Sequence, residues 1–277
     1  MSLANKTCWV VGGVGVIGRG IARDLLKAGA TVIVNSRSEG RLAKIATELG
    51  DPDRLITIHG SLLPGRAEKT VSRTLSSSPP LDHVVAHGAV RYWGPQNGKD
   101  ETHSLLRGNG PPGGLLEMGT EDFASASSHL AALHFAAAQQ LIPRLQFSSG
   151  VGSYTFVTGD GGGHPEGRRP ALGELNAHHV WGLSAALRNE PLGKDRVNVR
   201  ELRVRMAVNR PEGERADDPR DRPLSEDVGA LCAGLAVHPT GMDDHGELVE
   251  VTSESLGPLL ARYAGGSVED ADRFETA

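Results

Sequence analysis

Residues 7–37 read TCWVVGGVGVIGRGIARDLLKAGATVIVNSR, and this stretch decides the fold. A short apolar run, 7–11, is followed at once by a glycine-rich turn, as expected for a strand buried on both faces. Apolar residues then recur at helical spacing up to Gly29, a helix stop signal, and β-branched residues resume at 31–35. Strand, turn, helix and strand in this order predict a βαβ unit with two parallel strands.

The glycines of the turn predict a dinucleotide site. Gly12 permits the tight turn, Gly15 lets the backbone approach a pyrophosphate, and Gly18 lets the helix pack against the strand. The first amides of the helix, including those of Val16 and Ile17, then face the phosphates. They lie at the positive end of the helix dipole, which favours an anion. A glycine pattern alone is equally typical of an ordinary loop, but the flanking strand and helix supply the context of a nucleotide fingerprint.

The end of the second strand bears on which nicotinamide dinucleotide binds. An acidic residue there would bind the ribose hydroxyls of NAD, whereas this chain has Asn35, Ser36 and Arg37. Ser36 and Arg37, with Arg19 as a further candidate, suit a 2′-phosphate through charge-assisted hydrogen bonds. We therefore expect NADP(H) as the cofactor; the alternative is that Arg37 is a solvated surface charge.

Composition narrows the class of protein. The chain has 277 residues, enough for a sizeable core, and its 36 glycines and 16 prolines fall short of low-complexity disorder. A net charge of −5 argues against a nucleic-acid partner.

Cys8 and Cys232 are the only cysteines, which excludes a disulfide scaffold and favours a reducing compartment. No apolar run spans a bilayer and no signal peptide is evident, so we expect a cytoplasmic protein without a membrane partner. Cysteine and histidine spacing predicts no metal site.

From residue 7 to about residue 250 the chain resembles the short-chain dehydrogenase/reductase family. The opening, 10–37, is similar to the family's opening apart from Val11 and Val16. The stretch 82–90, DHVVAHGAV, is similar to its fourth strand and the turn that follows. Further stretches resemble, in order, its fourth helix, fifth strand, fifth helix and sixth strand: 129–143, 152–159, 183–190 and 195–199.

The resemblance implies a Rossmann-type, doubly wound α/β fold with a mostly parallel, seven-stranded sheet and helices on both faces. We expect a single domain over 1–262, with a cofactor half to about 145 and a substrate half from about 146. Residues 55–59 and 247–252 are expected to form the third and seventh strands, and 228–237 a helix. The charged stretch 209–227 is expected to be a flexible substrate lid, and 263–277 a flexible tail.

The resemblance also implies cofactor contacts outside the glycine turn. His87 and Gly88 follow the fourth strand, where the family touches the cofactor, so His87 is expected to contact the nicotinamide ribose or to line the pocket. Ser61 and Leu62 lie where the family binds adenine, although a solvated turn explains Ser61 equally well. In this family the fourth and fifth helices form a dimer interface, so we expect a homodimer or homotetramer.

The catalytic half departs from the family pattern. The resemblance places the family's tyrosine acid and its lysine partner at Gly173 and Ala177, neither of which donates a proton. The family's helix-four asparagine falls at His129 or Leu130. Its strand-five serine falls at Gly159 or Asp160, and the Pro-Gly after strand six at Leu202-Arg203.

Hydride transfer to a ketone leaves an alkoxide, so a positioned acid ordinarily matters. An iminium ion needs no proton at that step, and a nearby carboxylate would help by charge complementarity. Asp160, Thr158 and His164 are therefore the candidate catalytic residues, although 159–170 also suits a mobile, solvated loop. We expect an NADP(H)-dependent oxidoreductase acting on a small carbonyl or imine substrate. The alternatives are a non-catalytic NADP-binding sensor or silent subunit, and an isomerase or cyclase on the same fold.

Overall fold

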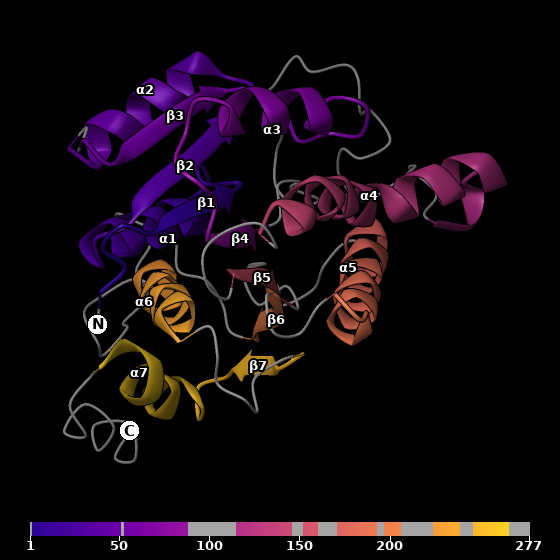
Figure 1. Ribbon diagram of the computed structural model, residues 1–277. Coiled ribbons are helices and arrows are strands. Elements are labelled where there is room, and N and C mark those ends of the chain that lie inside the picture. The colour runs from indigo at the N-terminus through magenta and orange to yellow at the C-terminus, as the bar shows by residue number, and fades with distance from the viewer. Residues whose placement is uncertain are drawn as a thin grey trace.

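Seven parallel strands form one sheet in the order β3-β2-β1-β4-β5-β6-β7 (Figure 1). The computed structural model describes residues 2–50, 53–87, 115–145, 152–159, 171–192, 197–205, 224–238 and 246–265. The strands are β1 (Thr7–Val11), β2 (Thr31–Ser36), β3 (Leu55–His59), β4 (His83–His87), β5 (Gly152–Gly159), β6 (Val197–Val204) and β7 (Leu248–Val251). The doubly wound α/β fold that the sequence predicts is thus confirmed.

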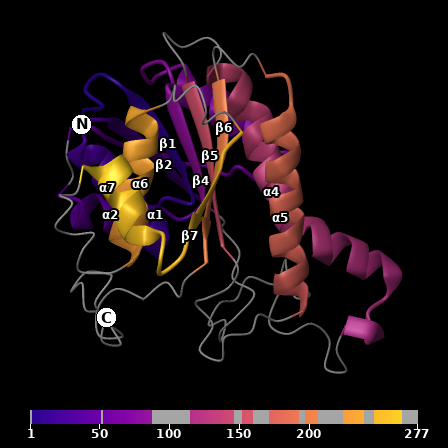
Figure 2. The same ribbon diagram turned by 90° about the horizontal axis from the view of Figure 1, so that it is seen from below.

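Helices cover both faces of this sheet, as Figure 2 shows. One face is packed by α1 (Val16–Lys27), α2 (Glu39–Glu48), α6 (Leu224–Val237) and α7 (Leu256–Ala264). The other is packed by α3 (Ala67–Leu75), α4 (Thr120–Leu145) and α5 (Ala171–Asn189), with a short 3₁₀ turn, η2 (Leu115–Glu117), before α4. None of the helices in the described ranges is both long and apolar enough to cross a membrane.

Strand β1 lies at the centre of the sheet and is buried on both faces. Trp9 points into the core beneath α3 and α4, whereas Cys8 and Val10 point into the core beneath α1 and α6. Chain order reverses here, because β1 pairs with β2 on one side and with β4 on the other. Open α/β sheets bind their ligands at such a switch point, beyond the carboxyl ends of the strands.

Small residues let the helices on the α1 face approach one another closely. A methyl group at Gly20 of α1 would lie 2.2 Å from the carbonyl oxygen of Ser225 on α6. A methyl group at Gly234 of α6 would lie 1.9 Å from the carbonyl oxygen of Tyr263 on α7. Both contacts are closer than real Cβ atoms allow, so each position requires glycine.

The sequence-based boundary of the sixth strand was wrong. β6 continues to Val204, so Leu202 and Arg203 lie within the strand rather than after it. The charged side chains of this strand find partners inside the protein, which is why they do not end it. Arg200, fully buried, donates to the carbonyl oxygens of Leu235 at 3.0 Å and His238 at 2.8 Å and so caps the end of α6.

Other boundaries also differ from the prediction. α1 begins at Val16, directly after the glycine turn, and α4 begins at residue 120, nine residues before the expected start. α6 begins at residue 224, within the stretch predicted as a charged lid, and buries Asp227 completely. α7 extends past residue 262 and buries Tyr263, so the tail expected from 263 starts too early. The rest of the predicted tail and lid lies outside the described residues.

The Gly20 contact makes a prediction about stability. We expect Gly20→Ala to lower the free energy of unfolding by roughly 1–3 kcal/mol, because the new methyl group meets the backbone of α6. Gly182→Ala is the matched control. This glycine lies exposed in α5 with open space around it, so alanine should raise the free energy of unfolding by about 0.5–1 kcal/mol. Urea denaturation measures both; equal effects of the two changes would contradict the close packing of α1 on α6.

Candidate functional site

The turn between β1 and α1 is built from its glycines. Gly12 has a φ of +78°, in the left-handed region that favours glycine. The amide of Gly13 donates to the carbonyl oxygen of Val10 at 3.2 Å, and that of Gly15 to the carbonyl oxygen of Gly12 at 3.0 Å. A methyl group at Gly18 would lie 2.3 Å from the carbonyl oxygen of Gly12. The glycine roles expected at positions 12 and 18 therefore have a geometric basis.

The N-terminus of α1 presents backbone amides to the switch point. Gly15 is its N-cap, and no side chain caps the helix. The amide of Arg19 is the first to bond back into the helix, to Gly15 at 2.9 Å. The preceding amides, those of Val16, Ile17 and Gly18, thus point outward at the positive end of the helix dipole. Such an end suits a phosphate, and an added Cβ at Gly15 would meet only the Gly12 oxygen, at 3.3 Å. The turn therefore fits the diphosphate of a dinucleotide.

Side chains at the end of β2 divide into internal and exposed groups. Asn35 accepts a hydrogen bond from the indole of Trp9 at 3.0 Å, so it serves the core. The hydroxyl of Ser36 accepts from the amide of Ser38 at 3.1 Å and shapes the turn into α2. Arg37 is exposed, and its guanidinium has no partner among the residues that the structure describes. A solvent-facing guanidinium at this position is free to bind an anion.

Two other residues expected to contact the cofactor, Arg19 and Ser61, already have partners within the protein. Arg19, considered for the 2′-phosphate, forms an ion pair with Glu48 of α2 at 2.5 Å. The hydroxyl of Ser61 accepts from the amide of Leu63 at 3.2 Å, while its backbone bonds to Thr70. Ser61 and Leu62 are both nearly buried in this turn after β3. Their role at an adenine ring stays a prediction.

Two histidines lie near one another behind the switch point. His87 ends β4, and its Nδ1 is buried without a partner among the described atoms, as is Nδ1 of His134 on α4. Burial lowers the pKa of each imidazole to about 4, and His87 lowers that of His134 further. Both rings are therefore neutral at neutral pH and are not reserves of acidic protons. Gly88 lies outside the described residues.

Thr158, near the end of β5, belongs to a buried ionic group. Its hydroxyl donates to Oε1 of Glu201 on β6 at 2.7 Å, and Glu201 is completely buried. Arg203 donates to the same oxygen through Nε and Nη2, both at 2.8 Å, while Nη2 of Arg188 lies 3.6 Å from the other oxygen. The Arg203 guanidinium stacks 4.5 Å above the ring of Trp181 on α5. The other two predicted catalytic residues, Asp160 and His164, lie outside the described residues.

Positions 173 and 177, to which the family resemblance assigns the tyrosine and lysine, lie on α5 and carry no ionisable group. Between them, Asn176 is completely buried and bridges α5 to α4. Its amide group donates to the carbonyl oxygen of Ala126 at 2.7 Å and accepts from the amide of Leu130 at 2.9 Å. These two groups would pair with each other in an uninterrupted helix. Figure 2 shows that the N-terminal part of α4 bends away from α5.

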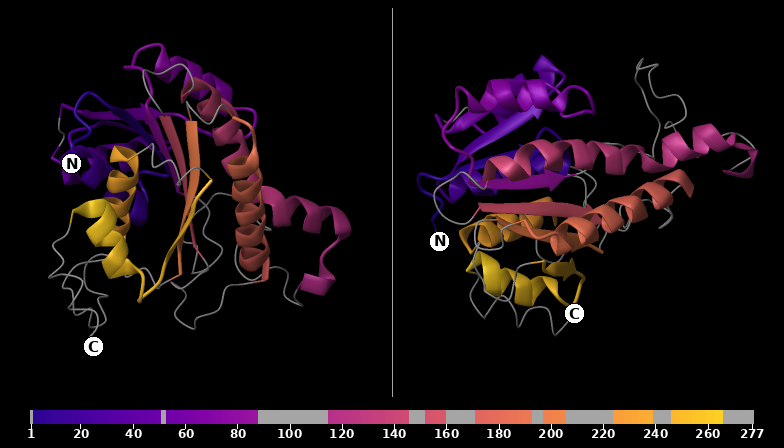
Figure 3. Two further views of the ribbon diagram at one scale, coloured as in Figure 1. Left: turned by 60° about the horizontal axis from the view of Figure 1, so that its bottom comes forward. Right: turned by 45° about the vertical axis from the view of Figure 1, so that its right-hand side comes forward.

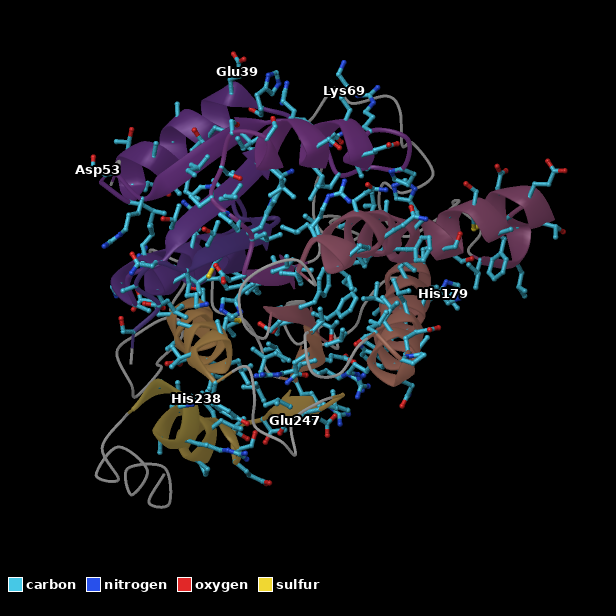
Figure 4. The ribbon with its side chains drawn as sticks, viewed as in Figure 1. Glu39, Asp53, Lys69, His179, His238 and Glu247 are labelled. Atoms are coloured by element: carbon cyan, nitrogen blue, oxygen red, sulfur yellow. The ribbon has the colours of Figure 1, made fainter. Side chains whose placement is uncertain are left out.

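His179 makes a second bridge where α5 meets α4 (Figure 4). Its Nδ1 lies 2.6 Å from the carbonyl oxygen of Ser127, which fixes the proton on Nδ1 because a carbonyl only accepts. Tyr154 does not supply the missing acid: its hydroxyl lies in the core beside Phe156, and burial raises its pKa. Within the described ranges no group of three or more metal-ligating side chains is gathered.

Sequence reasoning missed Glu201, Asn176 and His134. Glu201 breaks the apolar alternation of a strand, which signals a buried charge with internal partners. Asn176 lies at an apolar-face position of its helix, the signal for a buried, hydrogen-bonded amide. His134 lies within the alanine-rich face of α4, and nothing in the sequence distinguishes it from a surface residue.

The comparisons with known proteins agree with this geometry. The family model for short chain dehydrogenases matches residues 6–103, the part that carries the glycine turn and β1 to β4. Over these residues the chain is similar in sequence to short-chain dehydrogenases. A short-chain dehydrogenase/reductase of Macrophomina phaseolina (strain MS6), dpmpG, is 33% identical over 97 residues. That match covers 32% of this chain and 53% of the relative, so it spans about half the relative's length.

Solved structures share the short-chain dehydrogenase/reductase fold over most of the chain. The RhlG/NADP active-site complex of Pseudomonas aeruginosa has a TM-score of 0.66 at 22% identity, covering 90% of this chain and 96% of that one. A 3-ketoacyl-(acyl-carrier-protein) reductase from Brucella melitensis, complexed with NADH, has a TM-score of 0.65 at 22% identity, covering 90% and 98%. At this identity the likeness establishes the fold.

The buried histidines predict how stability depends on pH. The unfolded chain takes up protons on these side chains below a pKa of about 6.5, whereas the folded chain does so only near 4 for His83, His87 and His134. The free energy of unfolding should therefore fall as pH drops from about 6.5 to about 4. His134→Phe, beside Phe156, should remove about 3 kcal/mol of this fall. Urea denaturation at pH 7 and pH 4.5 measures the difference.

The matched control for this prediction is His238→Gln, because the side chain of His238 is exposed at the end of α6 (Figure 4). We expect this variant to keep the pH dependence of the wild type. If His134→Phe kept the wild-type fall between pH 7 and pH 4.5, folding would not lower the pKa of His134, and the prediction would be wrong.

Proposed function

We propose that the protein is an NADP(H)-dependent oxidoreductase that transfers hydride between the cofactor and a small carbonyl or imine substrate. The observation that carries the proposal is the uncapped N-terminus of α1, which presents three outward-facing amides at the switch point of a parallel sheet. The similarity of residues 6–103 to short-chain dehydrogenases supports the reaction class. The NADP and NADH complexes among the similar structures support a nicotinamide cofactor.

The residues around the switch point would hold each part of the cofactor. We assign the diphosphate to the turn Gly12–Gly18, the 2′-phosphate to Ser36 and Arg37, and the adenine to Ser61 and Leu62. His87 and Gly88, at the end of β4, are assigned to the nicotinamide ribose. When bound, the nicotinamide supplies or accepts the hydride. Everything else at the site has to come from this chain's own side chains.

The proposed chemistry has to work without a tyrosine–lysine pair. The positions assigned to that pair hold Gly173 and Ala177, which exchange no proton with a substrate. A substrate that is already protonated at its reacting group removes the need for a proton donor at the hydride step. We therefore favour an imine or iminium over a ketone. Thr158, with Asp160 and His164 from the following segment, remains our candidate for direct contact with the substrate.

A second function, a non-catalytic NADP-binding sensor or subunit, is favoured by the same vacancy at Gly173 and Ala177. The two proposals differ in cofactor consumption. Catalysis requires that NADPH absorbance fall on adding some member of a carbonyl and imine panel, whereas a sensor binds NADPH and consumes none. Conversion of a substrate without any absorbance change would instead indicate an isomerase or cyclase.

We further propose a single domain of cytoplasmic location and a homodimer or homotetramer assembled through α4 and α5. Figure 3 shows the N-terminal part of α4 extending beyond the rest of the molecule. Phe135 of α4 is 48% exposed, a large apolar side chain that a second copy would cover. Analytical ultracentrifugation measures the oligomeric state and so tests the proposed assembly independently of cofactor binding.

The glycine turn provides a test of cofactor binding. We expect Gly18→Ala to weaken NADPH binding at least tenfold in a fluorescence titration, because the methyl group displaces the Gly12 carbonyl and with it the amides of the turn. Gly40→Ala on α2 is the control, since its new methyl group would meet only the Ser38 hydroxyl, at 3.9 Å. No fluorescence change at millimolar NADPH with the wild-type protein would remove the proposal's premise.

The exposed guanidinium of Arg37 predicts the choice between cofactors. Arg37→Ser should raise the dissociation constant of NADPH about tenfold or more and leave that of NADH nearly unchanged, because only NADPH carries the 2′-phosphate. Lys69→Ser, on the outer side of α3 (Figure 4), removes the same charge elsewhere and should change neither constant. Equal loss of NADPH and NADH binding in Arg37→Ser would show that Arg37 does not recognise the 2′-phosphate.

A further inference from the structure

The Thr158 hydroxyl has only one proton to donate, and the structure shows where that proton goes. Thr158 Oγ1 lies 2.7 Å from Oε1 of Glu201, and that oxygen also receives Nε and Nη2 of Arg203. An oxygen that receives two guanidinium N–H groups acts as an acceptor, so the threonine has to be the donor. Its proton is thereby committed to Glu201.

The remaining hydrogen-bonding capacity of Thr158 is as an acceptor. The hydroxyl oxygen keeps its lone pairs, and Thr158 makes no second side-chain hydrogen bond within the described residues. Its position is the one before the end of β5, one residue past the level at which β4 ends at His87. Its side chain is half-exposed there, at the edge of the sheet where open α/β folds bind ligands.

The polarity of this group is held firmly. Glu201 is wholly buried, and Arg203 is clamped between it and the ring of Trp181. Arg188 approaches the second carboxylate oxygen at 3.6 Å and donates to the carbonyl oxygen of Gly246 at 2.6 Å. Turning the Thr158 hydroxyl toward a ligand would leave the buried carboxylate with one donor fewer, which is costly in a dry site.

From this polarity we infer that the site accepts a ligand that carries an N–H at its reacting group, an imine or iminium, and disfavours the isosteric ketone. This inference rests on the proposed function and names its substrate class. Thr158 contacts the ligand, and Glu201 is a positioning residue that sets the direction of the threonine's hydrogen bond. A ketone oxygen presents lone pairs to the lone pairs of Thr158, whereas a protonated imine presents a donor.

The reaction balances without a proton donor from the protein. The carbon of the protonated imine takes up a hydride, with its two electrons, from a reduced nicotinamide dinucleotide. The π pair of the C=N bond moves onto nitrogen as a lone pair. The nitrogen keeps its proton, which stays directed at Thr158. The absence of an ionisable group at positions 173 and 177 is therefore compatible with turnover of this class.

The test separates binding from turnover with two neutral five-membered rings, 2-pyrrolidinone and cyclopentanone, which differ by an N–H against a CH₂. Their dissociation constants are measured on the full chain saturated with NADP⁺, by ligand-observed NMR. We expect the wild type and Thr158→Ser to prefer 2-pyrrolidinone about tenfold or more, and Thr158→Val to lose that preference. Thr155→Val, the same substitution on the opposite face of β5, is the control and should retain it.

Glu201→Gln tests the positioning role, because a glutamine amide can present either an oxygen or an NH₂ to Thr158. Its preference for 2-pyrrolidinone should fall at least severalfold with NADPH affinity unchanged.

With NADPH as reductant, the wild type should reduce 1-pyrroline and leave cyclopentanone unreduced. Retention of the preference in Thr158→Val, or its absence in the wild type, would overturn the inference. If NADPH itself fails to bind, the proposed function fails instead.

Discussion

Helix α1 begins where it does because Gly18 has a hydrogen atom, and not a methyl group, facing the carbonyl oxygen of Gly12. That contact brings the first turn of the helix directly onto the end of β1, so its free amides meet the point where strand order reverses. The same stretch lies within the residues, 6–103, that match the model for short chain dehydrogenases. The arrangement of the N-terminal half of the molecule thus follows from one close approach of backbone to backbone.

In the C-terminal half of the sheet, buried charged side chains rather than glycines fix the geometry. β6 carries Arg200, Glu201 and Arg203 in its interior, and all three find partners within the protein. Arg200 faces α6 and caps its end, while the other two face α5. β6 therefore places buried charged side chains in contact with helices on both faces of the sheet. Such groups are retained at a cost in desolvation, which points to a role in holding a geometry.

The sequence predicts the first half of the structure well because its signals are local. The turn at 12–18 lies between a strand and a helix, and backbone sterics leave few alternatives there. The prediction that β6 ended before Leu202 rested on the family resemblance, and it was wrong because the strand continues to Val204. The partners that Arg200 and Glu201 find inside the protein are remote in sequence, so no local signal shows that the strand continues. Asn176 escaped notice for the same reason, since its partners at Ala126 and Leu130 lie on another helix. Asp160 and His164 remain predictions from sequence alone.

The side-chain amide of Asn176 affects whether α4 opens as one cooperative unit. Because it satisfies both the Ala126 carbonyl and the Leu130 amide, straightening the helix would leave the buried Asn176 side chain with its hydrogen bond to the Leu172 carbonyl oxygen and no donor for Oδ1 among the described residues. At this point of α4, a side chain from α5 therefore bonds to both the Ala126 carbonyl oxygen and the Leu130 amide. In solution the segment before residue 126 and the segment after 130 are expected to exchange their amide hydrogens as separate cooperative units, and the angle between them is set by α5.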